Sequence, residues 1–342
     1  MAKKEKESLN CSDFLGVRSE PITHFLSTGC TILDMAISNR MNGGFPAGRI
    51  CHIVGSESSA KTMFMAEVLR SSQAQKGTAY LVDSEGTFDF ARAKALHDID
   101  IKKLVYLGTQ DDEDFTIEYF FDKVVPYAIE GNKKRLPSVI GIDSLSAIPS
   151  SIETNEDISK GTYGTSRAKS LSTAFRKYIW KLTDANLSLV FIDQTRQKIG
   201  VTFGKKTTWS GGNAIGFYSS TRIETKVKAK IKNKFKKIIG VVVEFEVSKD
   251  KVAPPHKKGE IRILFEYGID DVGTNIVWLR VNDPNYPTKT GYCYPGSDEK
   301  FPSYEALVKH IHDEQQEEVL INEVWRVWQE IYAELEYKRR RV

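Results

Sequence analysis

A single stretch carries most of the fold information in this chain, Gly55-Ser56-Glu57-Ser58-Ser59-Ala60-Lys61-Thr62. It follows a short apolar run at 50–54 and leads into a segment at 63–75 with a helical pattern. A buried strand that turns at glycine into a helix directs several backbone N–H groups, and the positive end of the helix dipole, at one point. Phosphate oxygens suit that point. The stretch is therefore interpreted as a phosphate-binding loop, the alternative being a chance loop before a helix.

Two side chains of this loop have a direct chemical use. Lys61 places a mobile positive charge where the β and γ phosphates of a nucleotide would lie, and the Thr62 hydroxyl can hold Mg²⁺. The pattern G-x-x-x-x-G-K-[ST] has one deviation, because Ala60 stands where a second glycine is usual. A Cβ there is harmless in a near-helical backbone and costs roughly 1–2 kcal/mol where φ is positive. The sequence leaves both conformations open.

Composition and charge restrict the class of protein. A chain of 342 residues can bury the core of one large domain with appendages, or of two domains. The net charge of +4 is weak, so any basic character must be local. The four cysteines form no C-x-x-C pair, which predicts reduced thiols. The N-terminus has no signal-peptide pattern and no apolar run is long enough for a membrane span, so we expect a cytoplasmic protein without a membrane partner.

Short apolar runs follow the loop at 78–82, 103–107, 138–142 and 187–192, with helical patterns between them. This order is typical of an α/β fold with a mostly parallel, doubly wound sheet, and the run at 103–107 is expected toward the sheet edge. Ligands of such sheets bind at the carboxyl ends of the strands. We therefore expect Gly55, Glu85, Asp143 and Gln194 to lie close together.

These residues have predicted roles in nucleotide hydrolysis. Asp143 would hold Mg²⁺ together with Thr62, Glu85 would orient and deprotonate the attacking water, and Gln194 would bind the γ-phosphate. A carboxylate after a strand can instead cap the next helix, and this alternative is open for Asp143 and Glu85. Asp83 is expected to be such a structural residue.

Two polar segments are candidates for binding single-stranded nucleic acid. Residues 195–212 combine glycines and cations with Ile199, Phe203 and Trp209, and loops of this length are usually functional or disordered. Cations would follow the phosphates while apolar side chains stack on the bases or separate them. The earlier segment at about 152–167 is also polar and ends at Arg167.

From Lys226 to Lys236, lysine alternates with mostly apolar residues. Period two predicts a strand or hairpin arm with one lysine face and one partly apolar face. Lysines on one face would lie about 6.6–7 Å apart, close to the phosphate spacing of an extended single strand. Lys228, Lys230 and Lys232 are therefore candidate DNA contacts, and a solvated edge strand that lysine protects against aggregation is the alternative.

The chain is divided into an N-terminal arm at 1–25, a core at 26–270 and a small α+β unit at 271–342. The final helix of that unit has an apolar stripe, which indicates core packing or a docking surface rather than a cofactor site. The stripe consists of Leu320, Val324, Val327, Trp328, Ile331 and Leu335.

The motifs resemble those of bacterial RecA and its phage relatives, the strand-exchange ATPases of homologous recombination. Residues 55–62 are similar to the RecA phosphate loop G-P-E-S-S-G-K-T, and residues 139–147 to its Walker B segment. Residues 194–218 are similar to its second DNA-binding loop, which is the most specific match because other P-loop ATPases lack it. The resemblance covers about residues 26–270.

The resemblance implies a DNA-dependent ATPase that binds ATP and Mg²⁺, forms filaments on single-stranded DNA and exchanges strands with homologous duplex DNA. ATP would lie between neighbouring subunits, where Lys249 and Lys251 reach the γ-phosphate and Phe217 relays nucleotide state. The arm would pack on the adjacent subunit, DNA loops would lie near 152–167 and 195–210, and single-strand-binding and mediator proteins are further possible partners. The candidate catalytic set is Lys61, Glu85, Gln194, Lys249 and Lys251. The candidate nucleotide site consists of Gly55, Ser56, Glu57, Ser58, Ser59, Ala60, Lys61, Thr62, Asp89, Arg92 and Asp143. The candidate DNA site consists of Arg167, Arg196, Lys198, Ile199, Gly200, Phe203, Lys205, Trp209, Gly211 and Gly212, with the three lysines at 228, 230 and 232.

The chain differs from RecA at several of these positions. Asp193 stands where RecA has asparagine and would add negative charge near the γ-phosphate, and Arg92 stands where RecA stacks a tyrosine on adenine. The short N-terminus and unfamiliar C-terminus suggest a phage-type protein, in a bacterial or phage-infected cytoplasm. Two alternatives stay open: a nucleotide-gated single-strand-binding scaffold with little ATP turnover, and a ring-forming motor on the same core.

Overall fold

The computed structural model describes residues 22–108, 115–155, 163–197, 207–209, 212–286, 291–295, 297 and 299–333. The strands are β1 (Phe25–Leu26), β2 (Phe45–Pro46), β3 (Ile50–Gly55), β4 (Ala79–Asp83), β5 (Leu104–Gly108), β6 (Ser138–Asp143), β7 (Leu187–Gln197), β8 (Thr207–Trp209), β9 (Thr221–Lys232), β10 (Ile238–Asp250), β11 (Lys258–Leu264), β12 (Gly268–Ile269), β13 (Tyr292–Cys293) and β14 (Lys300–Phe301). The helices are α1 (Thr31–Ser38), α2 (Lys61–Ala74), α3 (Phe90–His97), α4 (Ile117–Tyr119), α5 (Val125–Gly131), α6 (Ser151–Asn155), α7 (Tyr163–Ala185), α8 (Gly212–Tyr218), α9 (Asp271–Asn282), α10 (Tyr304–Asp313) and α11 (Glu317–Ala333).

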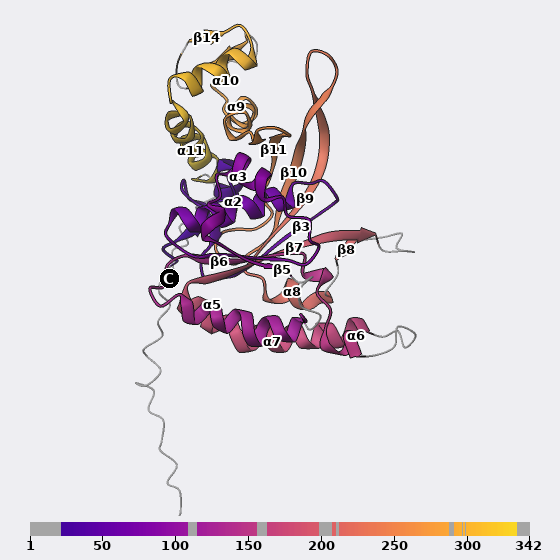
Figure 1. Cartoon of the computed structure of the whole chain (residues 1–342). Coiled ribbons are helices and arrows are strands. Elements are labelled where there is room, and N and C mark those ends of the chain that lie inside the picture. Colours follow the sequence, from indigo (N-terminus) through magenta and orange to yellow (C-terminus); the bar gives the residue numbers. More distant parts are fainter. Residues whose placement is uncertain are drawn as a thin grey trace, which may run out of the picture.

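One large sheet organises the molecule (Figure 1), with its strands in the order β12-β11-β10-β9-β3-β7-β6-β4-β5 and β8 paired to β7. From β5 to β9 the neighbouring strands are parallel, and β10, β11 and β12 extend the sheet with antiparallel pairs. The predicted mostly parallel α/β sheet is confirmed, as is the edge position of the run at 103–107. Parallel strands of this kind are buried on both faces, which explains their unbroken apolar runs.

Helices cover both faces of the sheet. Figure 1 shows α2, α3 and the C-terminal helices on one side and α5 and α7 on the other. Alternate strand residues supply the two cores: Ile53 and Ile192 pack on the α2 side, and Ile142 and Phe191 pack on the α7 side. The fold is therefore doubly wound, and side chains one residue apart on a strand enter different cores.

The lysine hairpin of β9 and β10 is present, but the expectation of one lysine face was wrong. Lys226 lies opposite Glu244, whereas Lys230 lies opposite Val241, and the register shifts between them. Lys228 is the extra residue of a β-bulge, and one extra residue inverts the alternation of every residue beyond it. Lys226 and Lys230 therefore belong to opposite faces of the sheet.

Each residue of α1 is buried. α1 is enclosed by β2, β10, β11 and α9, so no side of it faces solvent. No helix within the described ranges combines the length and the apolar character needed to cross a membrane.

The C-terminal helices share a core with the rest of the chain. Side chains of α9 and α11, such as Ile276 and Val324, lie in the same hydrophobic cluster as those of α1 and α2. The Asp271 carboxylate of α9 also accepts hydrogen bonds from the backbone N–H and the hydroxyl of Thr31, both at 2.7 Å. The division at residue 270 stays a prediction, since apolar packing is continuous across it.

The α11 stripe packs inward as predicted, with Leu320, Val324, Val327 and Trp328 buried; Leu335 lies outside the described residues.

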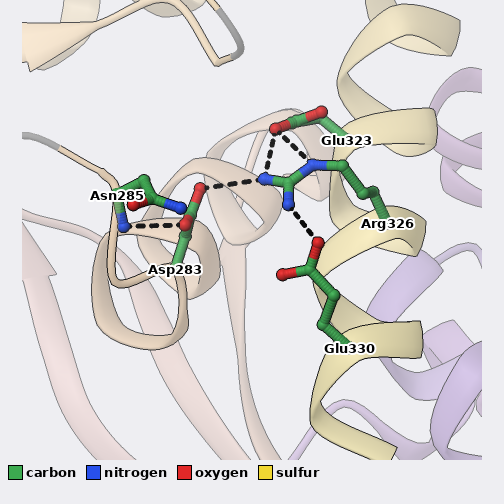
Figure 2. A network of polar contacts seen from close by, with 5 residues as sticks. All are labelled: Asp283, Asn285, Glu323, Arg326 and Glu330. Carbon is green, nitrogen blue, oxygen red and sulfur yellow. Dashed lines mark hydrogen bonds and ion pairs between the residues drawn. The ribbon is translucent and has the colours of Figure 1, made fainter. Parts of the chain in front are cut away.

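The polar side of α11 ties it to the end of α9. The Arg326 guanidinium donates to Glu323 at 2.6 Å, to Glu330 at 2.6 Å and to Asp283 at 3.3 Å (Figure 2). Asp283 in turn accepts a hydrogen bond from the backbone N–H of Asn285 at 2.9 Å. The carboxylates of Glu323, the main cause, and Glu330 raise the pKa of Arg326. The network orients α11 on α9, although exposed pairs of this kind contribute little free energy each.

Candidate functional site

A cavity of about 320 Å³ opens at the carboxyl ends of the parallel strands. It is lined by the loop from Glu57 to Thr62 and by Glu85, Asp143 and Gln194. The loop residues and Glu85 follow β3 and β4, Asp143 ends β6, and Gln194 lies within β7 opposite Gly55, the last residue of β3. The predicted convergence of Glu85, Asp143 and Gln194 at the phosphate loop is therefore present in the structure.

Strand β9 braces the phosphate loop from one side. A Cβ on Gly55 would lie 2.1 Å from the Thr225 hydroxyl, so only glycine fits at this turn. The Ser59 hydroxyl lies 2.7 Å from the carbonyl of Ser56 and 2.8 Å from the Thr225 hydroxyl. Ser56 and Gly55 thus shape the loop from behind, while residues 57–62 face the cavity.

Ala60 adopts the left-handed conformation, with φ 65° and ψ 20°. This is the conformation in which glycine has no steric cost and alanine costs roughly 1–2 kcal/mol. Of the two conformations that the sequence left open for Ala60, the structure has the one with positive φ, for which glycine is usual. Ala60 therefore adopts the backbone conformation that a glycine would have at this position.

The Lys61 ammonium folds back on its own loop and donates to the carbonyl of Ser56 at 2.7 Å. Burial lowers its pKa, and the carboxylates of Asp143 and Glu85 oppose that shift. A partly desolvated ammonium with one backbone acceptor is well placed to exchange that acceptor for phosphate oxygens.

Thr62 and Asp143 form the part of the cavity that fits a divalent cation. The Thr62 hydroxyl donates to the Asp143 carboxylate at 2.7 Å, so both oxygens already lie side by side. Burial raises the pKa of Asp143, and the nearby charges of Glu85 and Asp83 raise it further. No group of three or more His, Cys, Asp or Glu side chains in the described ranges could hold a metal alone. An Mg²⁺ ion at Thr62 and Asp143 would therefore complete its ligands with nucleotide phosphates and water.

Glu85 and Asp83 have different surroundings although they are close in sequence. Glu85 lines the cavity and accepts a hydrogen bond from the Ser144 hydroxyl at 2.7 Å. Asp83 is buried and accepts from the backbone N–H groups of Gly86 at 2.8 Å and Phe88 at 3.0 Å. Asp83 therefore shapes the turn, as expected, and leaves Glu85 facing the cavity.

The cavity lining also includes an arginine and an apolar wall. Arg92 lines the cavity and donates to the carbonyl of Phe265 at 2.8 Å. Val241, Ile263 and Phe265 form the apolar wall, and no sequence pattern predicts them. They come from β10 and the end of β11, far along the chain, and no local motif marks them. Asp89 does not line the cavity; its side chain caps α3 by accepting from the backbone N–H of Arg92 at 2.9 Å.

Asp193 and Gln194 project to opposite faces of β7. Gln194 lines the cavity, whereas Asp193 is fully buried on the other side and lies 2.8 Å from the ring nitrogen Nε2 of His52. Burial lowers the pKa of His52, and its bond to Asp193 opposes that shift. The Asp193 carboxylate therefore lies in the core beside His52 and does not line the cavity, although its negative charge acts on Lys61 and opposes the lowering of the Lys61 pKa.

Lys249 lies outside the cavity of its own subunit. Its ammonium donates to the carbonyls of Gly216 at 2.9 Å and Phe217 at 2.7 Å, at the end of α8. Burial, together with the charges of Lys251 and Arg222, lowers the pKa of Lys249 to about 8. Phe217 beside it is 71% exposed. Lys249 and Phe217 thus lie together at the end of α8, the helix that follows the second predicted DNA loop.

The predicted DNA-binding residues are only partly within the described residues. Helices α6 and α7 occupy both ends of the segment 152–167, which corrects its reading as one loop; residues 156–162 lie outside the described part. Arg167 donates to the carbonyl of Leu145, next to the Asp143 strand, rather than standing free for DNA. Lys228 forms an ion pair with Glu260.

In the second loop, Arg196 and Trp209 are placed only through their backbones, in the paired strands β7 and β8, and Gly212 begins α8. Lys198, Ile199, Gly200, Phe203, Lys205 and Gly211 lie outside the described residues.

A strand, a glycine turn and a helix that begins with Lys61 and Thr62, beside an aspartate at the end of a neighbouring strand, define a P-loop nucleotide-binding protein.

Comparison with known proteins gives the family. A family model for the RecA N-terminal domain matches residues 10–270. A Protein RecA of Fusobacterium nucleatum is 36% identical over 259 residues, which cover 76% of this chain and 65% of that protein. The Protein RecA of Dichelobacter nodosus is 35% identical over 277 residues, covering 80% and 74%, and that of Clostridioides difficile is 32% identical over 286 residues, covering 84% and 77%. The chain belongs to the RecA family, a family of P-loop ATPases.

These similarities support the recombinase interpretation and favour neither the scaffold nor the ring motor. The chain spans about two thirds of the Fusobacterium relative. The prediction of a phage-type protein has no support from these bacterial relatives and stays a prediction.

Proposed function

We propose that this protein is a DNA-dependent ATPase that assembles as a filament on single-stranded DNA and exchanges strands with a homologous duplex. One observation carries the proposal. Strand β7 places Gln194 in the cavity and continues through Thr195 to Gln197, where it pairs with β8. The same strand therefore connects the nucleotide cavity to both ends of the second predicted DNA loop. A movement of Gln194 on binding or loss of the γ-phosphate would therefore shift the strand that leads into that loop.

The residues of the cavity support ATP binding and hydrolysis. Backbone N–H groups of the loop and the Lys61 ammonium would bind the phosphates. Thr62 and Asp143 would hold Mg²⁺, which neutralises phosphate charge when bound. Glu85, fixed by the Ser144 hydroxyl, would accept a proton from the attacking water. Arg92 and the apolar wall at Val241 and Phe265 would contain the base.

The surface around α8 supports assembly. Lys249 and Lys251 lie close enough for the Lys251 charge to lower the pKa of Lys249, and both lie outside the cavity of their own subunit. We propose that the pair completes the cavity of a neighbouring subunit, with exposed Phe217 at the same contact. The arm at 1–25 would add a second contact between subunits, and proteins that bind single strands or load the filament would be further partners.

The test is ATP hydrolysis with and without single-stranded DNA, on one sample that is also examined by negative-stain electron microscopy. We expect filaments and hydrolysis that DNA stimulates at least tenfold, and expect Lys61→Ala to abolish both. Filaments without phosphate release would establish the scaffold instead, and closed rings would establish the motor. Absence of any ATP-dependent complex with DNA would refute the proposal.

A further inference from the structure

A second cavity, of about 790 Å³, opens between the end of α1, the turn from β10 to β11, and one face of α11. It shares no lining residue with the nucleotide cavity. Asn39 and residues 254–258 supply two of its sides. The third side consists of α11 residues at spacings of three and four, which place them on one face of the helix: Trp325, Trp328, Gln329 and Tyr332. Pockets that bind small ligands have volumes of roughly 300–1,000 Å³, so this cavity has room for side chains of a partner.

The aromatic side of the cavity is fixed by contacts within the chain. The indole N–H of Trp328 donates to the side-chain oxygen of Asn39 at 2.9 Å, and Trp328 is buried. The ring of Tyr332 lies 4.7 Å from the ring of Trp328. Trp325 and Tyr332 are half-buried, so part of each ring is accessible from the cavity. An aromatic wall that is already ordered loses little conformational entropy when an apolar group packs on it.

Lys257 occupies a position that faces the hydrophobic core. Its backbone carbonyl accepts a hydrogen bond from the N–H of Val247 at 2.9 Å, so the pairing of β10 with β11 extends to this residue. Ile261 and Ile263 follow in β11 and belong to the core cluster that includes α1 and α11. The alternation of side chains along a strand places Lys257 on the same face, and it is 6% exposed. Because lysine is almost never buried to this degree without a partner, its presence here indicates a function.

The ammonium of Lys257 has more donors than the chain uses. It donates to the carbonyl of Ala36, in the last turn of α1, at 3.3 Å. It lies 5.9 Å and 5.3 Å from the centres of the Trp328 and Tyr332 rings. No ion pair in the described part of the chain involves it. Burial lowers its pKa, and the charge of Asp250 opposes that shift. An ammonium has three donors, so the long bond to the end of α1 leaves donors for the oxygens of a ligand.

The charges around the cavity favour a partner with a single carboxylate over a polyanion. Lys258 pairs with Glu246 at 3.2 Å, and the His256 ring lies 3.5 Å from the same carboxylate. Arg326 on α11 is already surrounded by three carboxylates. Among the described residues that line the cavity, Lys257 is therefore the one lysine or arginine without an ion pair. A nucleic-acid strand needs a row of cations along its phosphates, whereas a peptide can bring one carboxylate beside a large apolar side chain.

We propose that this cavity binds a peptide segment of a partner protein. An Asp or Glu of the segment accepts hydrogen bonds from the Lys257 ammonium, and a neighbouring large apolar side chain packs on the rings of Trp325 and Tyr332. The site is separate from the nucleotide cavity and from the predicted DNA loops, so it does not depend on the proposed function.

The test selects peptides from a phage-displayed library of random dodecapeptides on the full-length protein, with single-stranded DNA added to occupy the DNA sites. Enriched peptides are synthesised, and their affinity is measured by fluorescence anisotropy. We expect them to contain Asp or Glu next to an aromatic or branched apolar residue, and expect Lys257→Met to weaken their binding at least tenfold. Lys309→Met is the charge-matched control, because Lys309 pairs with Asp313 on α10 and does not line the cavity. It should bind within twofold of wild type.

Thermal melts separate peptide recognition from a purely structural role of Lys257. If the residue served mainly to cap the end of α1, Lys257→Met would lower the melting temperature and leave peptide binding intact, which would overturn the proposal. We expect an equal or higher melting temperature, because methionine fills the same space without burying an ammonium that has one long hydrogen bond. Trp325→Ala is a second variant at the half-buried part of the wall and should weaken peptide binding at least fivefold, so the test does not depend on the folding of Lys257→Met alone.

Other occupants of the cavity give different results. A selection that enriches no peptide, or peptides without an acidic residue, would overturn the proposal. Displacement of the selected peptides by added single-stranded DNA would assign the cavity to nucleic acid. Peptides that match segments of this chain, together with weaker self-association of Lys257→Met in sedimentation, would assign it to a second copy; either result would refute a partner protein. ATP hydrolysis and filaments are measured separately, so failure of the proposed function would not be confused with failure of this site.

Discussion

Replacing Ala60 with glycine should stabilise the fold without improving nucleotide binding. Ala60 has φ 65°, and contacts within the chain, such as the Ser59 hydroxyl on the Ser56 carbonyl and the Thr225 hydroxyl, hold the loop in this shape, so we expect the same backbone strain with and without nucleotide. Strain that is equal in the free and bound states cancels from the binding free energy. It does not cancel from the free energy of unfolding, because the unfolded chain is free to leave the left-handed region.

The expected size follows from two opposing terms. Removing alanine from the left-handed region gains roughly 1–2 kcal/mol. The greater conformational freedom of glycine in the unfolded chain lowers this gain in the free energy of unfolding by about 0.4–1 kcal/mol. The net gain is on the order of 1 kcal/mol, which corresponds to roughly 1–3 °C in the melting temperature of a chain of this size. ATP affinity should stay within about threefold of wild type.

Thermal melts and titration with a fluorescent ATP analogue measure the two quantities on one preparation. Lys76→Gly is a matched control, because Lys76 has φ 63° and is exposed beyond the end of α2, outside the cavity. It should raise the melting temperature by a similar amount and leave ATP affinity unchanged. A tenfold gain in affinity for Ala60→Gly without a gain in stability would refute the reasoning, because it would show that the strain arises only on binding.

Two further predictions concern buried and half-buried charges. Asp193→Asn keeps a hydrogen-bonding side chain beside His52, so we expect stability within about 1 kcal/mol of wild type and ATP turnover within twofold; a tenfold change in phosphate release would instead place Asp193 at the γ-phosphate. Lys249 has a pKa of about 8 in the folded protein and 10.5 ordinarily, so the unfolded chain binds more protons between these values and the stability contributed by this group rises with pH from about 8 to 10.5. The free energy of unfolding is measured with urea at pH 7.5 and pH 10. Between these pH values, wild type should gain roughly 1 kcal/mol relative to Lys249→Gln, which is less than the pKa difference alone implies because solvent screens the half-exposed ammonium. A difference between the two proteins that does not change with pH would contradict this prediction.

The nucleotide cavity could be predicted largely from local patterns. Parallel strands end at one edge of a sheet, so residues that follow apolar runs, such as Glu85, Asp143 and Gln194, must meet there. The wall formed by Val241 and Phe265 could not be predicted in this way. It depends on β10 and β11 being added to the sheet beside β9, which is a long-range pairing that no motif near these residues records.

The amino-acid pattern alone was sufficient for the phosphate loop, the order of strands and helices and the sites at strand ends, because each depends on residues close together in the chain. The conformation of Ala60, the side of β7 that buries Asp193 and the face occupied by Lys230 required the folded protein. Each of these is set by a choice between two states of nearly equal local energy: the sign of φ, the side of a strand, and the register beyond a bulge. Packing against distant strands makes that choice, and a single sequence does not show which strands those are.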